Sequence, residues 1–189
     1  MINNQPITFV TKNKEKIADI KYMIGRFHDV EFTSDIDLIE IQSLSVEEVV
    51  AFKAKQAFDL LNKPVAVSDS GLEITSLNKF PGALVKFANE ALGQEKIVKL
   101  LEDEINRQAF FVAAIAFYDG KNNVHVFVER DEGTIAFEPR GEGWHFDRIF
   151  ILKGTTQTWA EIGRKDKNTH SAFRRALKKL EQFLEKNKK

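Results

Sequence analysis

Four polar clusters in this 189-residue chain contain residue types that could bind an anion or a metal ion. The segment "TKNKEK" at residues 11–16 carries three lysines, and single carboxylates occur at Glu40 in "LIEIQ" and at Asp69 in "SDSG". The fourth cluster, residues 141–147, combines glycines, aromatic residues and acids. Backbone N–H groups at a helix start bind phosphate, and carboxylates bind divalent metal ions. The clusters therefore indicate anion and metal chemistry if the fold brings them together.

Each cluster also has an explanation that involves no ligand. Lysines at a helix start are commonly just solvated, and Asp-Ser-Gly after a strand is commonly a plain turn. Three cations beside a helix N-terminus oppose the helix dipole, at about 0.3–1 kcal/mol each, and a bound polyanion would remove that cost. A single cluster therefore does not distinguish a ligand site from a ligand-free helix start or turn.

The apolar patterns predict an α/β fold with a mixed central sheet flanked by helices, in one domain over residues 1–189. Three strands are expected to run directly into polar clusters, at residues 7–10, 36–42 and 65–67. Helical spacing predicts helices at 17–27 and 45–61, in two pieces around Gly93, and from Ser171 onward. A central hairpin is expected to turn at 119–123, and further short strands are expected near 133 and 149–151. Ligands of open α/β sheets gather beyond strand ends, so the clusters are expected to converge.

Composition limits the classes of function. Lys+Arg and Asp+Glu both number 28, so the net charge is zero and gives no bulk attraction to nucleic acid or an anionic membrane. There is no cysteine, which excludes disulfides and thiolate chemistry. No apolar run approaches the ~20 residues that span a bilayer. We expect a soluble, cytoplasmic protein that binds neither membrane nor nucleic acid.

In their order along the chain, the motifs resemble those of the inosine triphosphate pyrophosphatases, which hydrolyse non-standard purine nucleoside triphosphates to the monophosphate and pyrophosphate. The resemblance runs from Ile7 to about Phe183. The segments that carry it are "TKNKEK" (11–16), "LIEIQ" (38–42), "SDSGLEI" (68–74), "FPGALVKF" (80–87), "GWHFDRIF" (143–150) and "TWAEIGRKDKN" (158–168). No single motif is decisive, but six in the same order are specific.

The resemblance implies an elongated fold with a cleft between two lobes, a Mg²⁺-dependent reaction and a homodimer. Asp69 would be the catalytic residue, and Glu40 with Asp69 would bind the metal. Lysines would neutralise the phosphates, and Trp144 and Phe146 would stack on the base. The substrate-binding residues that it implies are Thr11, Asn13, Lys16, Ser70, Gly71, Lys86, Trp144, His145, Phe146, Asp147, Lys167, Ser171 and Phe173.

The chain also departs from the family pattern. Lys12 replaces a glycine and Ser68 replaces an acid that precedes the aspartate, while His145 and Arg148 replace Gly and Pro in the aromatic loop. The family's Ser-His-Arg at the last helix, which reads the base, is Ser171-Ala172-Phe173 here. We therefore expect a triphosphate pyrophosphatase with altered or relaxed base choice, with Arg174 or His145 as substitute donors. The alternatives are a nucleotide-binding member with weak turnover and, less favoured, a nucleic-acid-binding protein.

Overall fold

The computed structural model describes residues 6–121, 123–143, 145–163 and 171–187. Within these residues the strands form one seven-stranded mixed sheet in the order β2-β1-β3-β5-β6-β7, with β4 paired to β3. The strands are β1 Ile7–Val10, β2 Val30–Thr33, β3 Val65–Ile74, β4 Pro81–Gly82, β5 Gln108–Tyr118, β6 His125–Ile135 and β7 Phe150–Leu152. The predicted α/β fold with a mixed sheet is confirmed.

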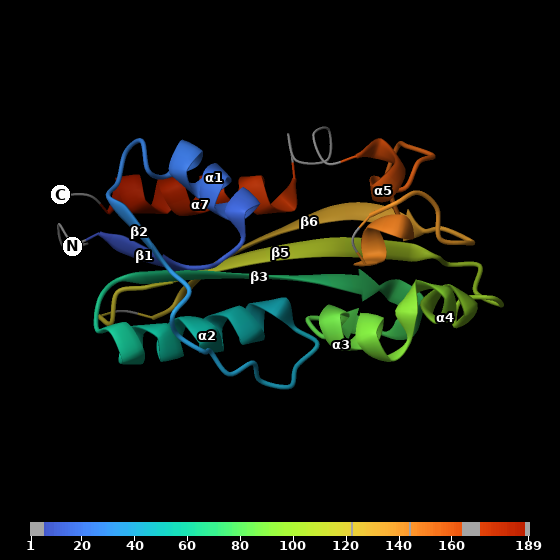
Figure 1. Cartoon of the computed structure of the whole chain (residues 1–189), viewed down its shortest axis with the longest axis horizontal. Coiled ribbons are helices and arrows are strands. Elements are labelled where there is room, and N and C mark those ends of the chain that lie inside the picture. Colours follow the sequence, from blue (N-terminus) through green and yellow to red (C-terminus); the bar gives the residue numbers. More distant parts are fainter. Residues whose placement is uncertain (1–5, 122, 144, 164–170, 188–189) are drawn as a thin grey trace.

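Helices cover both faces of this sheet, as Figure 1 shows. They are α1 Lys14–Met23, α2 Val46–Leu61, α3 Val85–Ala91, α4 Gly93–Lys99, α5 Trp159–Ile162 and α7 Ala172–Lys186. Helices α1 and α7 pack on one face through Ile20, Leu177 and neighbouring apolar residues, and α2 packs on the other through Val46 and Val50. In the described residues, no helix has both the length and the apolar character needed to cross a membrane.

The strand β3 differs from the sequence prediction because it does not stop before Asp69. It continues through "SDSG" to Ile74, and ten of its residues pair with β5. On the other edge of β3, β1 pairs with residues up to Val67, and the pairing with β4 begins at Leu72. Residues 68–71 therefore form a strand interior with one unpaired edge, and not the predicted turn.

Gly71 in this strand is required for packing. A Cβ added there would lie 2.5 Å from the carbonyl oxygen of Gly82 and 2.6 Å from Val46 Cγ2. Any larger residue would push β4 and the start of α2 away from the sheet.

The segment "IDLIEIQ" is the second difference, because it is not a strand. Residues 34–45 have no regular structure and cross from β2 to α2. Ile36 and Leu38 pack against the α2-side core, which explains the apolar alternation. The backbone of Ile39 bonds to the side chain of Gln56 instead of a neighbouring strand. Glu40 therefore lies on a loop beside α2.

Candidate functional site

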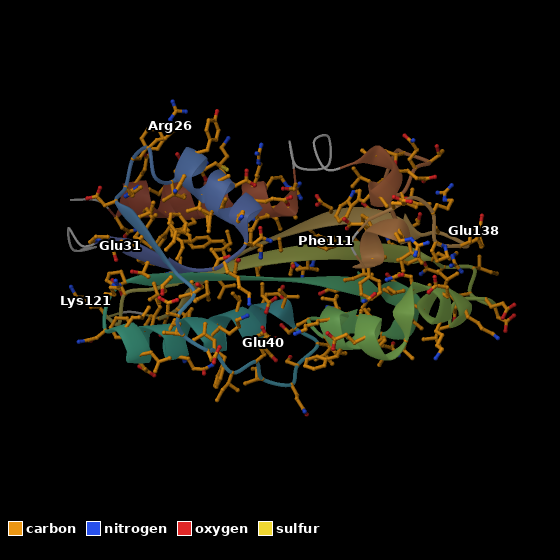
Figure 2. The ribbon with its side chains drawn as sticks, in the orientation of Figure 1. Arg26, Glu31, Glu40, Phe111, Lys121 and Glu138 are labelled. Atoms are coloured by element: carbon orange, nitrogen blue, oxygen red, sulfur yellow. The ribbon has the colours of Figure 1, made fainter. Side chains whose placement is uncertain are left out.

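Two carboxylates and one ammonium meet on the α2 face of the sheet. Lys53 Nζ, on α2, lies 2.7 Å from Glu40 Oε1 and 3.4 Å from Asp69 Oδ2. The Lys53 and Asp69 side chains are only 14% and 19% exposed, whereas Glu40 is 51% exposed. Figure 2 shows Glu40 at the α2 side of the molecule. The site is therefore closed at Asp69 and open to solvent at Glu40.

Burial and charge shift the acid–base behaviour of this group. Burial raises the pKa of Asp69, although the Lys53 ammonium and the Ser70 N–H, 2.8 Å from Asp69 Oδ1, favour the carboxylate. Burial alone would lower the pKa of Lys53, but its contacts with Asp69 and Glu40 outweigh burial and raise it. Lys53 stays charged because it has two carboxylate partners, whereas the attractions on the Asp69 carboxylate compensate its burial incompletely. A carboxylate with a raised pKa holds an accepted proton more tightly, which suits it to act as a general base.

Lys16, on α1, places a second cation beside the unpaired edge of β3. Its Nζ donates to Ser68 Oγ at 3.1 Å and lies 5.3 Å from the centroid of the Phe173 ring. Burial lowers the pKa of Lys16; the Asp69 carboxylate opposes this shift only in part, and Lys53 adds to it as a like charge. The direct contacts described for Lys16 are thus a hydroxyl and an aromatic ring. A partly buried cation with such neutral partners favours an anionic ligand.

The rest of "TKNKEK" behaves as an ordinary helix start. Asn13 caps α1 by accepting from the backbone N–H groups of Glu15 at 3.0 Å and Lys16 at 3.2 Å. Lys12 and Lys14 are exposed to solvent. Lys14 nevertheless lines the pocket described below, and Lys16 is the lysine of this segment that contacts β3.

A pocket of about 580 Å³ opens on the opposite face, the side of α1 and α7. Asn13 and Lys16 line one end, and the aromatic residues Phe111, Trp159 and Phe173 line the walls. Phe111 is marked in Figure 2, and its ring packs edge-on against Trp159 with centroids 4.8 Å apart. The volume is within the range of pockets that hold small organic ligands. Lys16 is therefore shared by the aromatic pocket and the carboxylate site.

The structure brings several of the predicted substrate-binding residues to this pocket. Its lining includes Asn13, Lys16, Ser70, Asp147, Ser171 and Phe173. Thr11 lies next to them, with its Oγ1 accepting from the Asn13 N–H at 3.2 Å. Asp69 and Glu40 meet on the other face, as described above.

Other predicted residues lie elsewhere. Gly71 is buried in β3, and Lys86 is exposed on α3, outside the pocket lining. Phe146 is only 6% exposed and packs in the core, which differs from the expectation that it stacks on a base. His145 begins a 3₁₀ turn over residues 145–148, but its side chain is outside the described part. Trp144 and Lys167 also lie outside the described residues.

Sequence reasoning missed Lys53, although α2 carries a signal for it. The apolar stripe of this helix includes Val46, Val50 and Ala57, and Lys53 falls at the same spacing. A lysine within a buried stripe needs a partner, and this one has two carboxylates.

Arg174, one of the two substitute donors expected from the sequence, is bound to Asp19. Its Nη2 and Nε lie 2.6 and 3.0 Å from Asp19 Oδ1, which joins α7 to α1 at the pocket margin. Phe173, one residue earlier, presents its ring to Lys16 instead. The described wall from α7 is therefore aromatic.

The donor set of the carboxylate site fits a divalent cation. Glu40 and Asp69 converge on one ammonium, so a metal ion in place of the Lys53 head group would have two anionic ligands. Among the described residues no three His, Cys, Asp or Glu side chains cluster as a metal cage. Mg²⁺ commonly takes one or two carboxylates and completes its shell with water and phosphate oxygens.

Comparison with known proteins identifies the family of this chain. The model of the Ham1 family matches residues 7–183. The chain is 36% identical over 177 residues to a dITP/XTP pyrophosphatase of Korarchaeum cryptofilum, covering 93% of this chain and 94% of the relative. It is 35% identical to a dITP/XTP pyrophosphatase of Thermococcus kodakarensis over 184 residues, 97% of this chain and 99% of the relative.

Solved structures show the same similarity. The Staphylococcus aureus Ham1 protein superposes with a TM-score of 0.85 at 31% identity, covering 97% of this chain and 100% of that one. A HAM1 protein from Coxiella burnetii gives a TM-score of 0.83 at 28% identity, covering 96% and 98%. The match spans both the sheet and the site-bearing segments, and it confirms the resemblance to the inosine triphosphate pyrophosphatases: this chain belongs to the Ham1 family.

Proposed function

We propose that this chain hydrolyses non-standard purine nucleoside triphosphates, of the dITP and XTP type, to the monophosphate and pyrophosphate. The observation that carries the proposal is the group formed by Asp69, Lys53 and Glu40, with Lys16 at the unpaired edge of β3. The group offers carboxylates for a metal ion and a proton, and cations for phosphates, and Lys16 also lines the aromatic pocket.

In the proposed reaction, a water oxygen attacks the α-phosphorus and the bond from that phosphorus to the α–β bridging oxygen breaks. The electron pair leaves with pyrophosphate, and Asp69 accepts the proton of the water. Asp69 Oδ1 accepts from the Ser70 N–H and Oδ2 contacts the Lys53 ammonium, so Oδ2 becomes available to the attacking water when Lys53 shifts. Lys16 offsets phosphate charge, which otherwise repels the attacking water.

Glu40 and Asp69 would hold Mg²⁺, which supplies further neutralisation of the phosphates when bound. The Lys53 ammonium lies between the two carboxylates, so it must shift as the metal binds, and phosphate oxygens are its natural new partners. One carboxylate cannot easily bind metal and accept a proton through the same oxygen. Two different Asp69 oxygens, or Glu40 as the main ligand, would separate these roles.

The base would lie among Phe111, Trp159 and Phe173, since flat rings favour stacked or edge-on aromatic neighbours. The described α7 wall offers Phe173 where the family has Arg, and Arg174 is held by Asp19. We therefore propose that this protein has a relaxed preference for 6-keto purines.

We also propose a homodimer that acts in the cytoplasm, where nucleoside triphosphates are present. Four large apolar residues near the Glu40 loop, α2 and α3 support an interface between copies: Ile39, Leu44, Phe52 and Phe87 are 70%, 38%, 39% and 59% exposed. Light scattering coupled to gel filtration tests this state, and a monomer at micromolar concentration would refute it.

The deciding experiment for the activity is a panel of nucleoside triphosphates incubated with and without Mg²⁺. Pyrophosphate and orthophosphate are quantified separately, because only attack at the α-phosphorus releases pyrophosphate. Release of pyrophosphate that depends on metal is the expected result. Nucleotide binding without pyrophosphate release would instead identify a binding protein that has lost turnover.

A further inference from the structure

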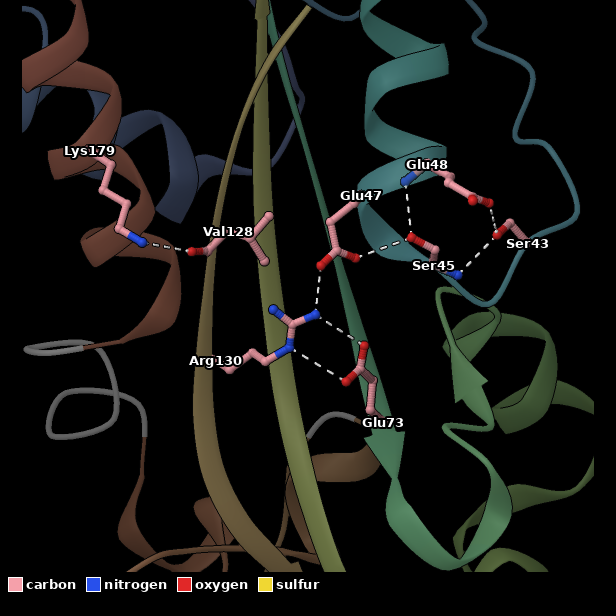
Figure 3. A network of polar contacts seen from close by, with 8 residues as sticks. All are labelled: Ser43, Ser45, Glu47, Glu48, Glu73, Val128, Arg130 and Lys179. Atoms are coloured by element: carbon pink, nitrogen blue, oxygen red, sulfur yellow. Dashed lines mark hydrogen bonds and ion pairs between the residues drawn. The ribbon is translucent and has the colours of Figure 1, made fainter.

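Glu40 depends on a loop whose two ends are fixed by different contacts. At its start, the Asp35 N–H donates to Thr33 Oγ1 at 3.3 Å. At its end, Ser43 Oγ donates to Glu48 Oε2 at 2.7 Å and accepts from the Ser45 N–H at 3.0 Å (Figure 3). Neither contact reaches the residues next to Glu40.

The backbone in the middle of this loop is hydrogen-bonded by one side chain, Gln56. The Ile39 N–H donates to Gln56 Oε1 at 3.1 Å, and Gln56 Nε2 donates to the Ile39 carbonyl oxygen at 2.8 Å. Within the described residues, these are the only hydrogen bonds to the backbone of residues 36–42. The Ile39 residue is 70% exposed, so its own side chain does not anchor the loop.

These two hydrogen bonds, called the Gln56 clamp below, lie directly beside the carboxylate site. Gln56 is three residues after Lys53 on α2, so the two side chains project from the same face of the helix. Their loop partners, Ile39 and Glu40, are consecutive. An amide that bonds both the N–H and the carbonyl of one residue fixes the orientation of the peptide as well as its position, as a strand partner would. The direction of the next side chain is thereby set.

We propose that Gln56 is a positioning residue that holds Glu40 in place for metal binding, an inference that rests on the proposed function of Glu40. Groups that orient metal ligands without touching the metal typically change metal affinity by about 10- to 100-fold when removed. Gln56 is such a group, because it bonds to the peptide before Glu40 and does not contact the carboxylate itself.

A residue that only fastened a loop would have a different effect. Ile36 and Leu38 pack on the α2-side core, so the loop remains docked when the Gln56 hydrogen bonds are lost. Thermal stability should then change little in a Gln56 variant, while the backbone beside Glu40 is no longer fixed and the Glu40 side chain can take several positions. The two roles are separated by measuring metal dependence and stability on the same variants.

The test uses Gln56→Met, which keeps the length of the side chain but forms neither hydrogen bond. Lys55→Met, at the exposed neighbouring position of α2, is the matched control. We expect Gln56→Met to raise the Mg²⁺ concentration for half-maximal activity by about 10-fold and to weaken Mn²⁺ binding in electron paramagnetic resonance equally. The turnover at saturating metal should stay within about twofold, and the control should match the wild type.

Two further measurements make the proposal refutable. Amide hydrogen exchange should show loss of protection at Ile39 in Gln56→Met. Unchanged protection would show that Gln56 does not hold the Ile39 backbone. In a Glu40→Gln background, Gln56→Met should add no further change in metal dependence, because its effect passes through Glu40. An equal effect in both backgrounds, or lost protection with unchanged metal binding, would overturn the positioning role. If Glu40→Gln alone leaves the metal titration unchanged, the proposed metal site and the role of Gln56 toward it both fail, and Ile39 exchange still decides whether the clamp exists.

Discussion

Replacing Asp69 by Asn should abolish turnover without unfolding the protein. The substitution keeps the shape of the side chain and removes the charge that a metal ion or a proton requires. A loss of at least ~10²-fold in kcat is expected for a general base, which corresponds to about 2.7 kcal/mol in activation free energy.

The structure also predicts the effect on stability. At 3.4 Å, the attraction between Lys53 and Asp69 is about 5 kcal/mol for an effective dielectric constant of about 20. Lys53 keeps its contact with Glu40 at 2.7 Å, so it is not left unpaired by the substitution. Burial nevertheless raises the pKa of Asp69, which means that desolvation of the carboxylate outweighs its attractions. We therefore expect the free energy of unfolding of Asp69→Asn to equal or exceed that of the wild type near neutral pH.

The pH dependence of stability gives the same test with a definite sign. Because the folded state raises the pKa of Asp69 above its ordinary value of 3.8, the native protein binds the proton more tightly than the unfolded chain. The Asp69 contribution to stability is present below the ordinary value and is lost as the pH rises through the raised pKa. Asp69→Asn should remove this part of the pH dependence.

Pyrophosphate release and thermal melting across pH are measured for Asp69→Asn and for Asp59→Asn, an exposed aspartate on α2, as the control. Turnover near the wild-type level would end the proposed mechanism. A collapse of the melting temperature by more than about 10 °C would show that lost folding, and not lost chemistry, explains the inactivity.

Three further variants test the other parts of the site. Lys16→Ala should raise KM for triphosphates, because the cation beside Ser68 is lost while both carboxylates remain; an unchanged KM would leave Lys16 as a helix-start lysine. Glu40→Gln should mainly weaken Mg²⁺ binding, seen as a higher Mg²⁺ concentration for half-maximal activity. An unaltered metal titration would exclude Glu40 from the site. The double variant Ala172→His with Phe173→Arg should shift kcat/KM toward inosine over adenosine triphosphate, with a melting curve to verify folding; strong wild-type selectivity for inosine triphosphate would contradict relaxed base choice.

Elements with local signals could be predicted from the sequence. Ser171 caps α7, and the apolar stripe of this helix identifies its buried face. The β5–β6 hairpin follows from two β-rich runs around Asp119 and Gly120. These features depend on neighbouring residues in the chain, so no knowledge of the tertiary structure is needed.

The errors concern segments whose conformation is decided by distant partners. Serine and glycine favour turns, but β3 continues through residues 68–71 because β5 pairs with all of them. Alternating apolar residues at 36–42 resemble a strand, yet their partner is the Gln56 side chain on α2. The contact of Lys53 with Asp69 likewise depends on how α2 packs against the sheet, and no local sequence pattern predicts that packing.

The alternation of side chains along β3 makes the chemistry depend on strand register. Ser68 and Ser70 face the aromatic pocket side, while Asp69 faces Lys53. A slip of one residue against β5 would exchange the two faces, placing a carboxylate among the aromatic rings and a serine between the lysines. Gly71 opposes such a slip, because any other residue in its place would collide with Gly82 and Val46. An insertion or deletion inside β3 should therefore abolish activity even where the sheet still forms, whereas one in a loop can be absorbed.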